Sequence, residues 1–329
     1  MPDVSLNEIE ARTFAALTRH GAADVPARAV AQAVREAEAT GNRICGLYYL
    51  DSYCRQLSSG RVRGDAEPRV RRPRPGHVLV DAADGFAQPA FAAGLPPAIR
   101  AAEANGIAIL TVAHSHTATA MGFFTGQIAR AGLIGLGMTN ASPTVAGPGG
   151  RARVIGTNPV AFSVPDGQGG VALQFDFSTS ATALGAITMA AEAGEDIPEG
   201  WAVDAEGQPT TDPQAALNGA LSSSGGYKGW GLGLMVEVLA AAMTGSVLSQ
   251  DVHPLRDSAG PPHDFGQFYL LIDPGTAPDF AERFTRLAAA VAADPGARLP
   301  GAGRVPTDPV AVDDVLWDGV LALSGAPEA

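Results

Sequence analysis

Two histidines flank a serine directly after a short apolar segment. Residues 107–112 read IAILTV, a run typical of a buried strand, and His114, Ser115 and His116 follow closely. Imidazoles at a strand end could bind a metal, donate protons or contact a ligand. We expect no metal, because no third histidine, cysteine or carboxylate stands near them in the sequence. A polar turn without a chemical role is the alternative.

A glycine-rich stretch at 225–233, GGYKGWGLG, is a second candidate site. Its glycines let the backbone approach a ligand, Lys228 supplies a cation, and an apolar helix follows at once. Free N–H groups at the start of a helix, next to a lysine, suit a phosphate. The alternative is a glycine-rich helix entry with a solvated lysine. Neither GxGxxG after a strand nor GxxxxGK[ST] occurs, so the common dinucleotide and P-loop fingerprints are excluded.

Three further segments place hydroxyl and amide groups at predicted turns. The segments MTNASP and GTNP set Thr139, Asn140 and Asn158 close to a proline. The segment DFSTS begins at Asp176, ends another apolar run and could cap the next helix. Taken singly, each segment is typical of an ordinary turn.

The surrounding pattern predicts helices at both ends of the chain and a mixed sheet between them. Ser5 and Glu8 have the spacing of a capping box at the start of a helical region that runs to residue 39. Further helices are expected at 48–57, 121–131, 181–193, 231–243, 279–293 and 313–323, and strands at 107–112, 133–140, 159–164, 171–177 and 268–272. The arginine- and proline-rich segment 61–75 reads as an extended linker, and 194–226 as turns. This order is not a clean βαβ alternation, so we expect an α/β fold of the mixed α+β kind.

Composition limits the possible partners. The chain has 329 residues, of which 46% are hydrophobic and 17% charged, enough to bury a large core. A net charge of −12 argues against nucleic acid, although an anionic cofactor can still occupy a local basic pocket. The two cysteines, Cys45 and Cys54, form no zinc pair or disulfide framework, and no apolar run is long enough to span a bilayer. We expect a cytoplasmic protein with a small-molecule substrate and no membrane partner.

Taken together, the segments resemble the malate/L-lactate dehydrogenase family, which also holds sulfolactate and ureidoglycolate dehydrogenases and Δ1-piperideine-2-carboxylate reductases. The resemblance rests on AGLIGLGMTNASP, RARVIGTNPVAFSVP, FDFSTS, IPEGWAVDAEGQPTTDP, GGYKGWGLGLMVEVLAAAMTG and LPG, in this order. It covers most of residues 5–323 and is densest from 131 to 245. It implies a non-Rossmann NAD(P)-binding sheet domain with flanking helical domains. It also implies a homodimer whose active site lies between domains and near the partner subunit.

The resemblance further implies domain boundaries and cofactor contacts. We expect a helical domain of 1–75 with 302–329, a sheet domain of 76–180 with 227–301, and a small helical, turn-rich segment at 181–226. The residues at the family's cofactor-contacting positions are His114, Ser115, His116, Thr139, Asn140, Asp176, Phe177, Ser178, Lys228, Pro300 and Gly301. The side chain of Asn158 is expected to face the substrate.

The chain departs from the family at the substrate positions. The family has Ser-His-Gly followed by Leu-x-Arg near the N-terminus, Arg-Gly after the DxxTS segment, and in many members a histidine after the HSH-like segment. The residues that stand at these places here are Ile44, Cys45, Tyr49, Leu184 with Gly185, and Thr117. The usual proton donor and two guanidinium partners of a substrate carboxylate are therefore absent.

The remaining candidates for the proton donor are His116, Cys45, Tyr48 and Tyr49. We expect an NAD(P)H-dependent oxidoreductase, NADPH being favoured, that transfers hydride to a C=O or C=N bond of a cyclic imine or ketone rather than to a small 2-oxoacid. A 2-hydroxyacid dehydrogenase of the malate or lactate type, with another donor, is one alternative. A catalytically silent or non-redox cofactor-binding protein is an alternative of another class.

Overall fold

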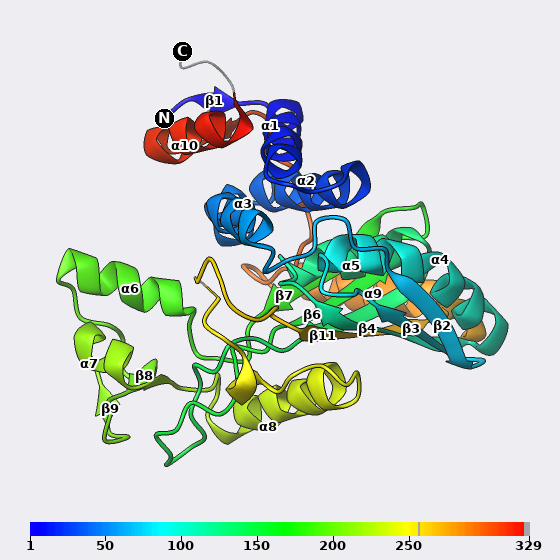
Figure 1. Ribbon diagram of the computed structural model, residues 1–329. Helices are drawn as coiled ribbons and strands as arrows, with labels where there is room; N and C mark the ends of the chain where they lie inside the picture. The colour runs from blue at the N-terminus through cyan, green and yellow to red at the C-terminus, as the bar shows by residue number, and fades with distance from the viewer. Residues whose placement is uncertain (256, 326–329) are drawn as a thin grey trace.

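Helices from the two ends of the chain pack into one helical layer. The computed structural model describes residues 1–255 and 257–325, and this layer lies at the top of Figure 1. Its helices are α1 (Leu6–Arg19), α2 (Asp24–Ala39), α3 (Leu50–Ser59) and α10 (Asp314–Ser324). The side chain of Ser5 accepts a hydrogen bond from the N–H of Glu8, so the predicted cap of the first helix is present. The short strands β1 (Asp3–Val4) and β12 (Val310–Ala311) pair and hold the two chain ends together.

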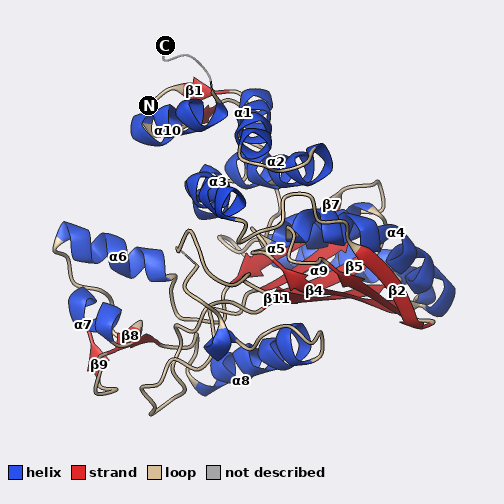
Figure 2. Cartoon of the chain, in the orientation of Figure 1, coloured by secondary structure: helices blue, strands red, loops and turns tan. Residues whose placement is uncertain are grey.

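A seven-stranded sheet forms the centre of the molecule (Figure 2). In spatial order its strands are β2 (Arg69–Arg74), β3 (His77–Asp81), β4 (Ile107–Ser115), β11 (Phe265–Ile272), β5 (Ile134–Thr139), β6 (Val160–Pro165) and β7 (Val171–Phe177). The pair β3 and β4 is parallel, and every other neighbouring pair is antiparallel. The sheet is therefore mixed, and the parallel pair β3 and β4 forms a single βαβ crossover unit.

Helices cover both faces of this sheet. On one face α4 (Ala87–Asn105) and α5 (Met121–Arg130) pack on a core that includes Phe91, Phe124 and Tyr269. On the other face lie α8 (Tyr227–Val236) and the π-helical turn η3 (Glu237–Ala242), whose Val236 and Ala240 contact Met138 and Phe268. Figure 1 shows α8 below the sheet and α4 and α5 above it.

Because of the directions in which the strands run, many of the loops that connect them lie at one edge of the sheet. The strands β3, β4, β5 and β7 run in the same direction, so their carboxyl ends lie at this edge, where β6 and β11 begin. This edge faces the helical layer and the small third part of the chain (Figure 1). Polar side chains at the strand ends are therefore brought close to residues from distant parts of the sequence.

The third part of the chain extends from the sheet edge, at the left of Figure 1. Its elements are α6 (Leu184–Ala193), α7 (Pro213–Asn218), β8 (Ala202–Val203), β9 (Pro209–Thr210) and β10 (Ala220–Leu221). A small core of its own, including Ile187, Ile197 and Leu221, holds them together with Val145 and Ile155. The helix α9 (Phe280–Ala292) and the short turns η4 (Ser249–Asp251) and η5 (Pro274–Thr276) complete the chain after α8.

Most predicted elements are confirmed, but the segment 61–75, the helix α4, the segment 194–226 and the strand β3, for which no element was expected, differ. The segment 61–75 is not simply a linker, because Arg69–Arg74 forms the exposed edge strand β2, a position that tolerates proline and is protected by its charges. The helix α4 escaped prediction because Pro96 and Pro97 lie inside it. The predicted turns at 194–226 contain one helix and three short strands. Among the described residues no helix is long and apolar enough to cross a membrane.

Candidate active site

The segment 42–49 connects the helical layer to the sheet edge. It forms two short turns, η1 (Arg43–Cys45) and η2 (Leu47–Tyr49). The buried carboxylate of Glu38 accepts a hydrogen bond of 2.7 Å from the N–H of Leu47, and a side chain at Gly46 would collide with Glu38. This contact fixes the segment against α2, and so fixes the positions of Ile44, Cys45 and the tyrosines that follow.

Cys45 stands where the resemblance places a catalytic histidine. Burial raises the pKa of its thiol to about 12, the charge of nearby Asp176 adds to the shift, and a hydrogen bond with Asn42 opposes it. The thiol is therefore fully protonated at neutral pH, but releasing its proton would leave a poorly solvated thiolate. Cys45 is a weak proton donor.

Two tyrosines follow on the same segment. The ring of Tyr48 is exposed and lies edge-on to Tyr49 at 5.3 Å between centroids, and Tyr49 stacks on Tyr53 at 6.1 Å. The phenol of Tyr53 is buried, and burial raises its pKa. The three tyrosine rings therefore form one aromatic cluster that follows Cys45 in the chain.

His116 is buried and its protonation state follows from its partners. The amide nitrogen of Gln56 donates to the carbonyls of Leu255 at 2.6 Å and Asp257 at 3.1 Å, so the amide oxygen is left to accept from Nε2–H of His116, at 2.6 Å. Nδ1 then accepts a hydrogen bond of 3.1 Å from the hydroxyl of Thr117. His116 is therefore the neutral Nε2–H tautomer, with both ring nitrogens occupied.

The surroundings of His116 keep it neutral. Its ring stacks on His263 with 4.2 Å between centroids, and Arg61 lies close to both rings. Burial lowers the pKa of His116 well below its usual value, and the charges of His263 and Arg61 add to this. Arg61 is itself buried and donates to the carbonyls of Pro254 at 2.9 Å and Pro261 at 3.0 Å. His116 is thus held as a neutral ring by Gln56, Thr117 and His263, with no free N–H to donate as an acid.

His114 and Ser115 end β4 with different roles. Nδ1–H of His114 donates to the carboxylate of Asp264 at 2.8 Å, and both residues have a backbone φ of +53°, which is strained for residues other than glycine. The side chain of His114 is half-exposed. Ser115 is buried and donates to the carbonyl of Phe265 at 3.0 Å, so its hydroxyl joins β4 to β11. Of these two residues, His114 is therefore the one whose side chain can contact a ligand.

The two turns with asparagine are tied to the protein interior. Thr139 donates to the carbonyl of Gly266 at 2.8 Å, and Asn140 bridges Gly266 and Val247. Asn158 is fully buried and has a φ of +36°. Their expected roles toward cofactor and substrate stay predictions.

The amide of Asn158 makes a set of contacts within the protein. It accepts from the N–H of Ala141 and donates to Gly233 and to the carboxylate of Glu237, the last at 2.8 Å. Glu237 in turn accepts from both the N–H and the hydroxyl of Ser249. Asn158 therefore holds the turn after β5, the helix α8 and the turn η4 in one arrangement.

Asp176, at the end of β7, lies in a cavity of about 400 Å³. Its Oδ2 accepts a hydrogen bond of 2.8 Å from the N–H of Gly122, in the first turn of α5. The residue keeps surface open to the cavity, yet its carboxyl group is surrounded by enough protein for burial to raise its pKa. Hydrogen bonds from Gly122 and Met121 and the charge of Arg304 oppose this shift.

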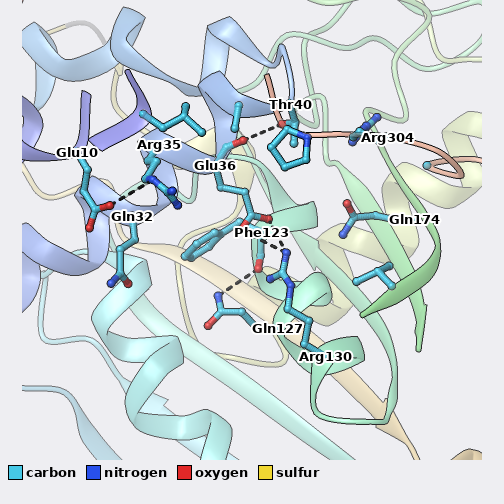
Figure 3. Close-up of a pocket in the computed structure, with 15 residues that line it drawn as sticks. Glu10, Gln32, Arg35, Glu36, Thr40, Phe123, Gln127, Arg130, Gln174 and Arg304 are labelled. Atoms are coloured by element: carbon cyan, nitrogen blue, oxygen red, sulfur yellow. Dashed lines mark hydrogen bonds and ion pairs between the residues drawn. The ribbon is translucent and has the colours of Figure 1, made fainter. Parts of the chain in front are cut away.

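A larger cleft of about 670 Å³ adjoins this cavity and shares Gln174 and Arg304 with it (Figure 3). Arg35 of α2, Arg130 of α5 and Arg304 of the segment after Gly301 line the cleft, as Figure 3 shows. Arg35 lies 3.4 Å from Glu10, and Arg130 lies 3.4 Å from Glu36. Since the lining holds three guanidinium groups and two carboxylates, the cleft is locally basic in an acidic protein.

The remaining cofactor candidates lie around the same edge. Pro300 and Gly301 contact β7, where the N–H of Gln174 donates a hydrogen bond of 3.0 Å to the carbonyl of Pro300. Phe177 is exposed, and its ring stacks on Phe175 at 5.1 Å. Ser178 makes a hydrogen bond of 3.0 Å with Ser180 in the loop that leads to α6. Of these residues, Gly301 lines the cleft, whereas Phe177 and Ser178 lie at the end of β7 and just after it. Their contacts with a cofactor stay predictions.

The start of α8 fits an anionic cofactor. Gly225 and Gly226 have φ of +62° and +63°, and nothing lies within 4 Å of the place where a side chain would stand. The first hydrogen bond of the helix runs from the N–H of Trp230 to Gly226, so the N–H groups of 227–229 have no partner within the helix. Lys228 in this turn is exposed. Backbone N–H groups, open glycines and a cation are what a phosphate needs, and a bound NAD(P)H would supply hydride.

Two departures from the family pattern meet in space. The methyl Cδ1 of Ile44 lies 3.9 Å from the position that a Cβ would take at Gly185. Leu184, the preceding residue, is partly exposed, as is Ile44. The structure therefore places the apolar side chain of Ile44 beside the backbone of Gly185, next to Leu184, where the resemblance places a serine and an arginine.

Several residues of the site carried no readable signal in the sequence. Gln56, Arg61, His263 and Arg304 are ordinary polar residues in their local context, and only the fold shows which carbonyls, rings or cavities they meet. Within the described part of the chain, no group of three or more His, Cys, Asp or Glu side chains is arranged to hold a metal ion.

Comparison with known proteins identifies the family. The model of the malate/L-lactate dehydrogenase family matches residues 4–311, and the chain belongs to this family. The Δ1-pyrroline-2-carboxylate/Δ1-piperideine-2-carboxylate reductase of Pseudomonas putida is 39% identical over 99% of this chain and 96% of that protein. The (2R)-3-sulfolactate dehydrogenase (NADP(+)) of Chromohalobacter salexigens is 38% identical over 92% and 90%. The chain is accordingly an NAD(P)-dependent oxidoreductase.

A solved relative confirms the expected fold class. The crystal structure of Δ1-piperideine-2-carboxylate reductase from Pseudomonas syringae pathovar tomato has a TM-score of 0.90 and 33% sequence identity, covering 98% of this chain and all of that one. The mixed sheet with flanking helical parts is therefore the fold of this family.

Proposed function

We propose that this protein uses NADPH to reduce the C=N bond of a cyclic imine. The observation that carries the proposal is the end-to-end match, 39% identical over 99% of the chain, to a reductase of Δ1-pyrroline- and Δ1-piperideine-2-carboxylate. Three other relatives at 36–39% identity are also Δ1-pyrroline-2-carboxylate reductases.

The chemistry of the cavity favours an imine over a small 2-oxoacid. A 2-oxoacid and a cyclic imine-2-carboxylate both carry a carboxylate that needs a cationic partner, so the difference lies in the reacting group: a carbonyl oxygen needs an acid in the site, whereas an imine nitrogen can bind already protonated. Leu184 and Tyr49 stand where the family resemblance places arginines, and Cys45 where it places the acid. An imine nitrogen becomes cationic when protonated, and the carboxyl group of Asp176 in the cavity suits such a group.

NADPH is the proposed reductant. The cleft beside Gly301 carries an excess of guanidinium groups over carboxylates, which suits the additional phosphate of NADPH. Lys228 and the start of α8 offer a second place for phosphate. The sulfolactate dehydrogenase relative uses NADP(+), which agrees with this choice.

A homodimer is also part of the proposal. On α8 and η3 the apolar side chains of Leu232, Leu234, Met235 and Val238 are exposed. A contiguous apolar helix face of this kind is typical of a protein interface. Light scattering at micromolar protein concentration should give twice the chain mass of 33.5 kDa, and a monomer would contradict the proposal.

The direct test is product analysis. Purified protein is incubated with NADPH and Δ1-pyrroline-2-carboxylate, and amino acids are separated by chromatography. We expect proline, the product of hydride addition to the ring carbon and proton addition to the nitrogen. Consumption of NADPH with pyruvate or oxaloacetate but not with the imine would instead indicate a 2-hydroxyacid dehydrogenase. Cofactor binding without turnover of any of these would indicate a non-redox protein.

A further inference from the structure

An exposed strand of arginines marks one end of the molecule. Four of the 22 lysines and arginines of the chain lie in the six-residue edge strand β2, at the right of Figure 1. All residues of β2 are exposed, and its outer edge pairs with no other strand among the described residues. Within the same part of the chain none of these arginines makes an ion pair. We call this patch the arginine edge, and its members are Arg69, Arg71, Arg72 and Arg74.

The opposite end of the molecule carries only negative charges. Between Arg153 and Lys228 the chain has no lysine, arginine or histidine. Residues 184–221 of this stretch form the third part of the chain, at the left of Figure 1, and we call them the acidic arm. No ion pair to its carboxylates is found among the described residues. The exposed acidic residues of the arm are Glu192, Glu195, Asp196, Glu199, Glu206 and Asp212.

These two patches complement each other in charge but cannot meet within one chain. They lie at opposite ends of the molecule, with the sheet between them (Figure 1). Two arginine edges repel each other, and so do two acidic arms. A second copy of this chain, however, carries the complementary patch for each of them. Charge complementarity therefore favours a contact between the arginine edge of one copy and the acidic arm of another.

The exposed apolar face of α8 and η3 limits how two copies can face each other. This face lies below the sheet, between the arginine edge and the acidic arm (Figure 1). A two-fold axis in such an interface can run along the molecule or across it. An axis along the molecule places arm on arm and edge on edge, where like charges meet. An axis across the molecule places the arm of each copy at the arginine edge of its partner, and this contact occurs twice.

We propose that in the homodimer the arginine edge of each chain docks on the acidic arm of the other. The inference rests on the homodimer proposed above and adds which surfaces meet and in which orientation. It also gives the contact a role at the candidate active site. The arm begins with Leu184 and Gly185, beside Ile44, so the partner's arginine edge steadies the part of the chain that carries these substrate-site candidates.

Charge reversal in two separate chains tests the contact. One variant carries Arg71→Glu with Arg72→Glu, in the arginine edge. The other carries Glu195→Arg with Asp196→Arg, in the acidic arm. Each variant pairs with itself through two repulsive contacts, whereas in a mixed dimer both contacts join opposite charges. When the two are co-expressed with different tags, native mass spectrometry should count about fivefold or more mixed dimers over the two unmixed kinds together, since exposed charge pairs contribute about 0.2–1 kcal/mol each.

The matched control reverses two arginines in the helical layer. Arg19 of α1 and Arg28 of α2 are exposed and lie above the sheet, on the side away from α8. Arg19→Glu with Arg28→Glu makes the same change in charge as the variant of the arginine edge. When it is co-expressed with the reversed acidic arm, mixed dimers should not exceed the half that random pairing gives.

Other outcomes would overturn the inference. Random pairing of the two reversed chains would show that the arginine edge and the acidic arm do not meet in the dimer. An equal excess of mixed dimers with the control variant would assign the effect to overall charge. If the wild-type protein is a monomer, the proposed homodimer fails first, and this contact fails with it.

The wild-type protein allows a second test, should a reversed variant fold poorly. Raising the salt concentration from about 0.1 M to about 1 M shortens the screening length from about 10 Å to about 3 Å. The Kd of the dimer, measured by dilution in mass photometry, should then rise about tenfold or more. A Kd that is unchanged or lower at high salt would indicate an interface held by the apolar face alone and would contradict the docking of the charged ends.

Discussion

Acid should unfold this protein partly through a pair of buried histidines. His263 is buried against His116, and neither of its ring nitrogens has a hydrogen-bond partner among the described residues. Burial lowers the pKa of His263 to about 3, and the charge of Arg61 adds to the shift. The folded protein therefore keeps this ring neutral at a pH at which the unfolded chain protonates it.

The sign and the size follow from linkage between folding and protonation. Below pH 6.5 the unfolded state binds a proton at His263 that the folded state does not, so stability falls as pH falls. Each pH unit in this range costs about 1.4 kcal/mol per histidine, so His263 alone should cost about 2 kcal/mol between about pH 6.5 and pH 5. The stacked ring of His116, whose pKa is also lowered, adds to the loss.

Urea unfolding at about pH 7 and about pH 5 measures this effect. His263→Phe keeps a stacked ring but cannot be protonated, so its free energy of unfolding should fall by about 2 kcal/mol less than that of the wild type. The control is His253→Gln, which removes an exposed histidine from the same segment and should leave the wild-type difference unchanged. If wild type and His263→Phe lose the same free energy between the two pH values, the reasoning is refuted.

Three further changes test the proposed cofactor site, substrate site and dimer. Lys228→Ala should weaken NADPH binding by about 1.5–3 kcal/mol, roughly ten- to a hundredfold in Kd, because a charge-assisted contact is lost; an unchanged Kd in a fluorescence titration would remove Lys228 from the site. The triple change Ile44→Ser, Cys45→His and Tyr49→Arg should raise kcat/KM for pyruvate above the parent value, since it restores an acid and a cation; no increase would show that these positions do not meet the substrate. Val238→Asp should convert the dimer to monomers in light scattering, since it places a charge on an exposed apolar face; a dimer of unchanged stability would place the interface elsewhere.

Local sequence rules predicted the elements whose signals are local. Ser5 and Glu8 have the spacing of a capping box, and the helix starts there. The bounds of β7 agree with an apolar run between turn residues. The helix α4 was missed because Pro96 and Pro97 lie on its course, and the packing of its apolar face on β3 and β4 outweighs their local cost.

The site was only partly predictable, for a physical reason. The motifs placed His114, Asp176 and Lys228 at strand and helix ends, and these positions were readable because such ends expose polar groups. Which groups face one another depends on the strand order, which brings residues more than a hundred positions apart into contact. His116 illustrates this, because its tautomer is set by Gln56, and Gln56 is itself oriented by carbonyls of a segment two hundred residues further on.

The most direct test of the proposed function is the ratio of two specificity constants. Initial rates of NADPH oxidation give kcat/KM for Δ1-piperideine-2-carboxylate and for pyruvate with the same wild-type enzyme. We expect the imine to be preferred by at least about a hundredfold, because the loss of a general acid costs a carbonyl substrate roughly 10²–10⁴-fold, whereas an imine nitrogen can bind already protonated. Efficient reduction of pyruvate, with kcat/KM equal to or above that for the imine, would contradict the proposed cyclic imine reductase.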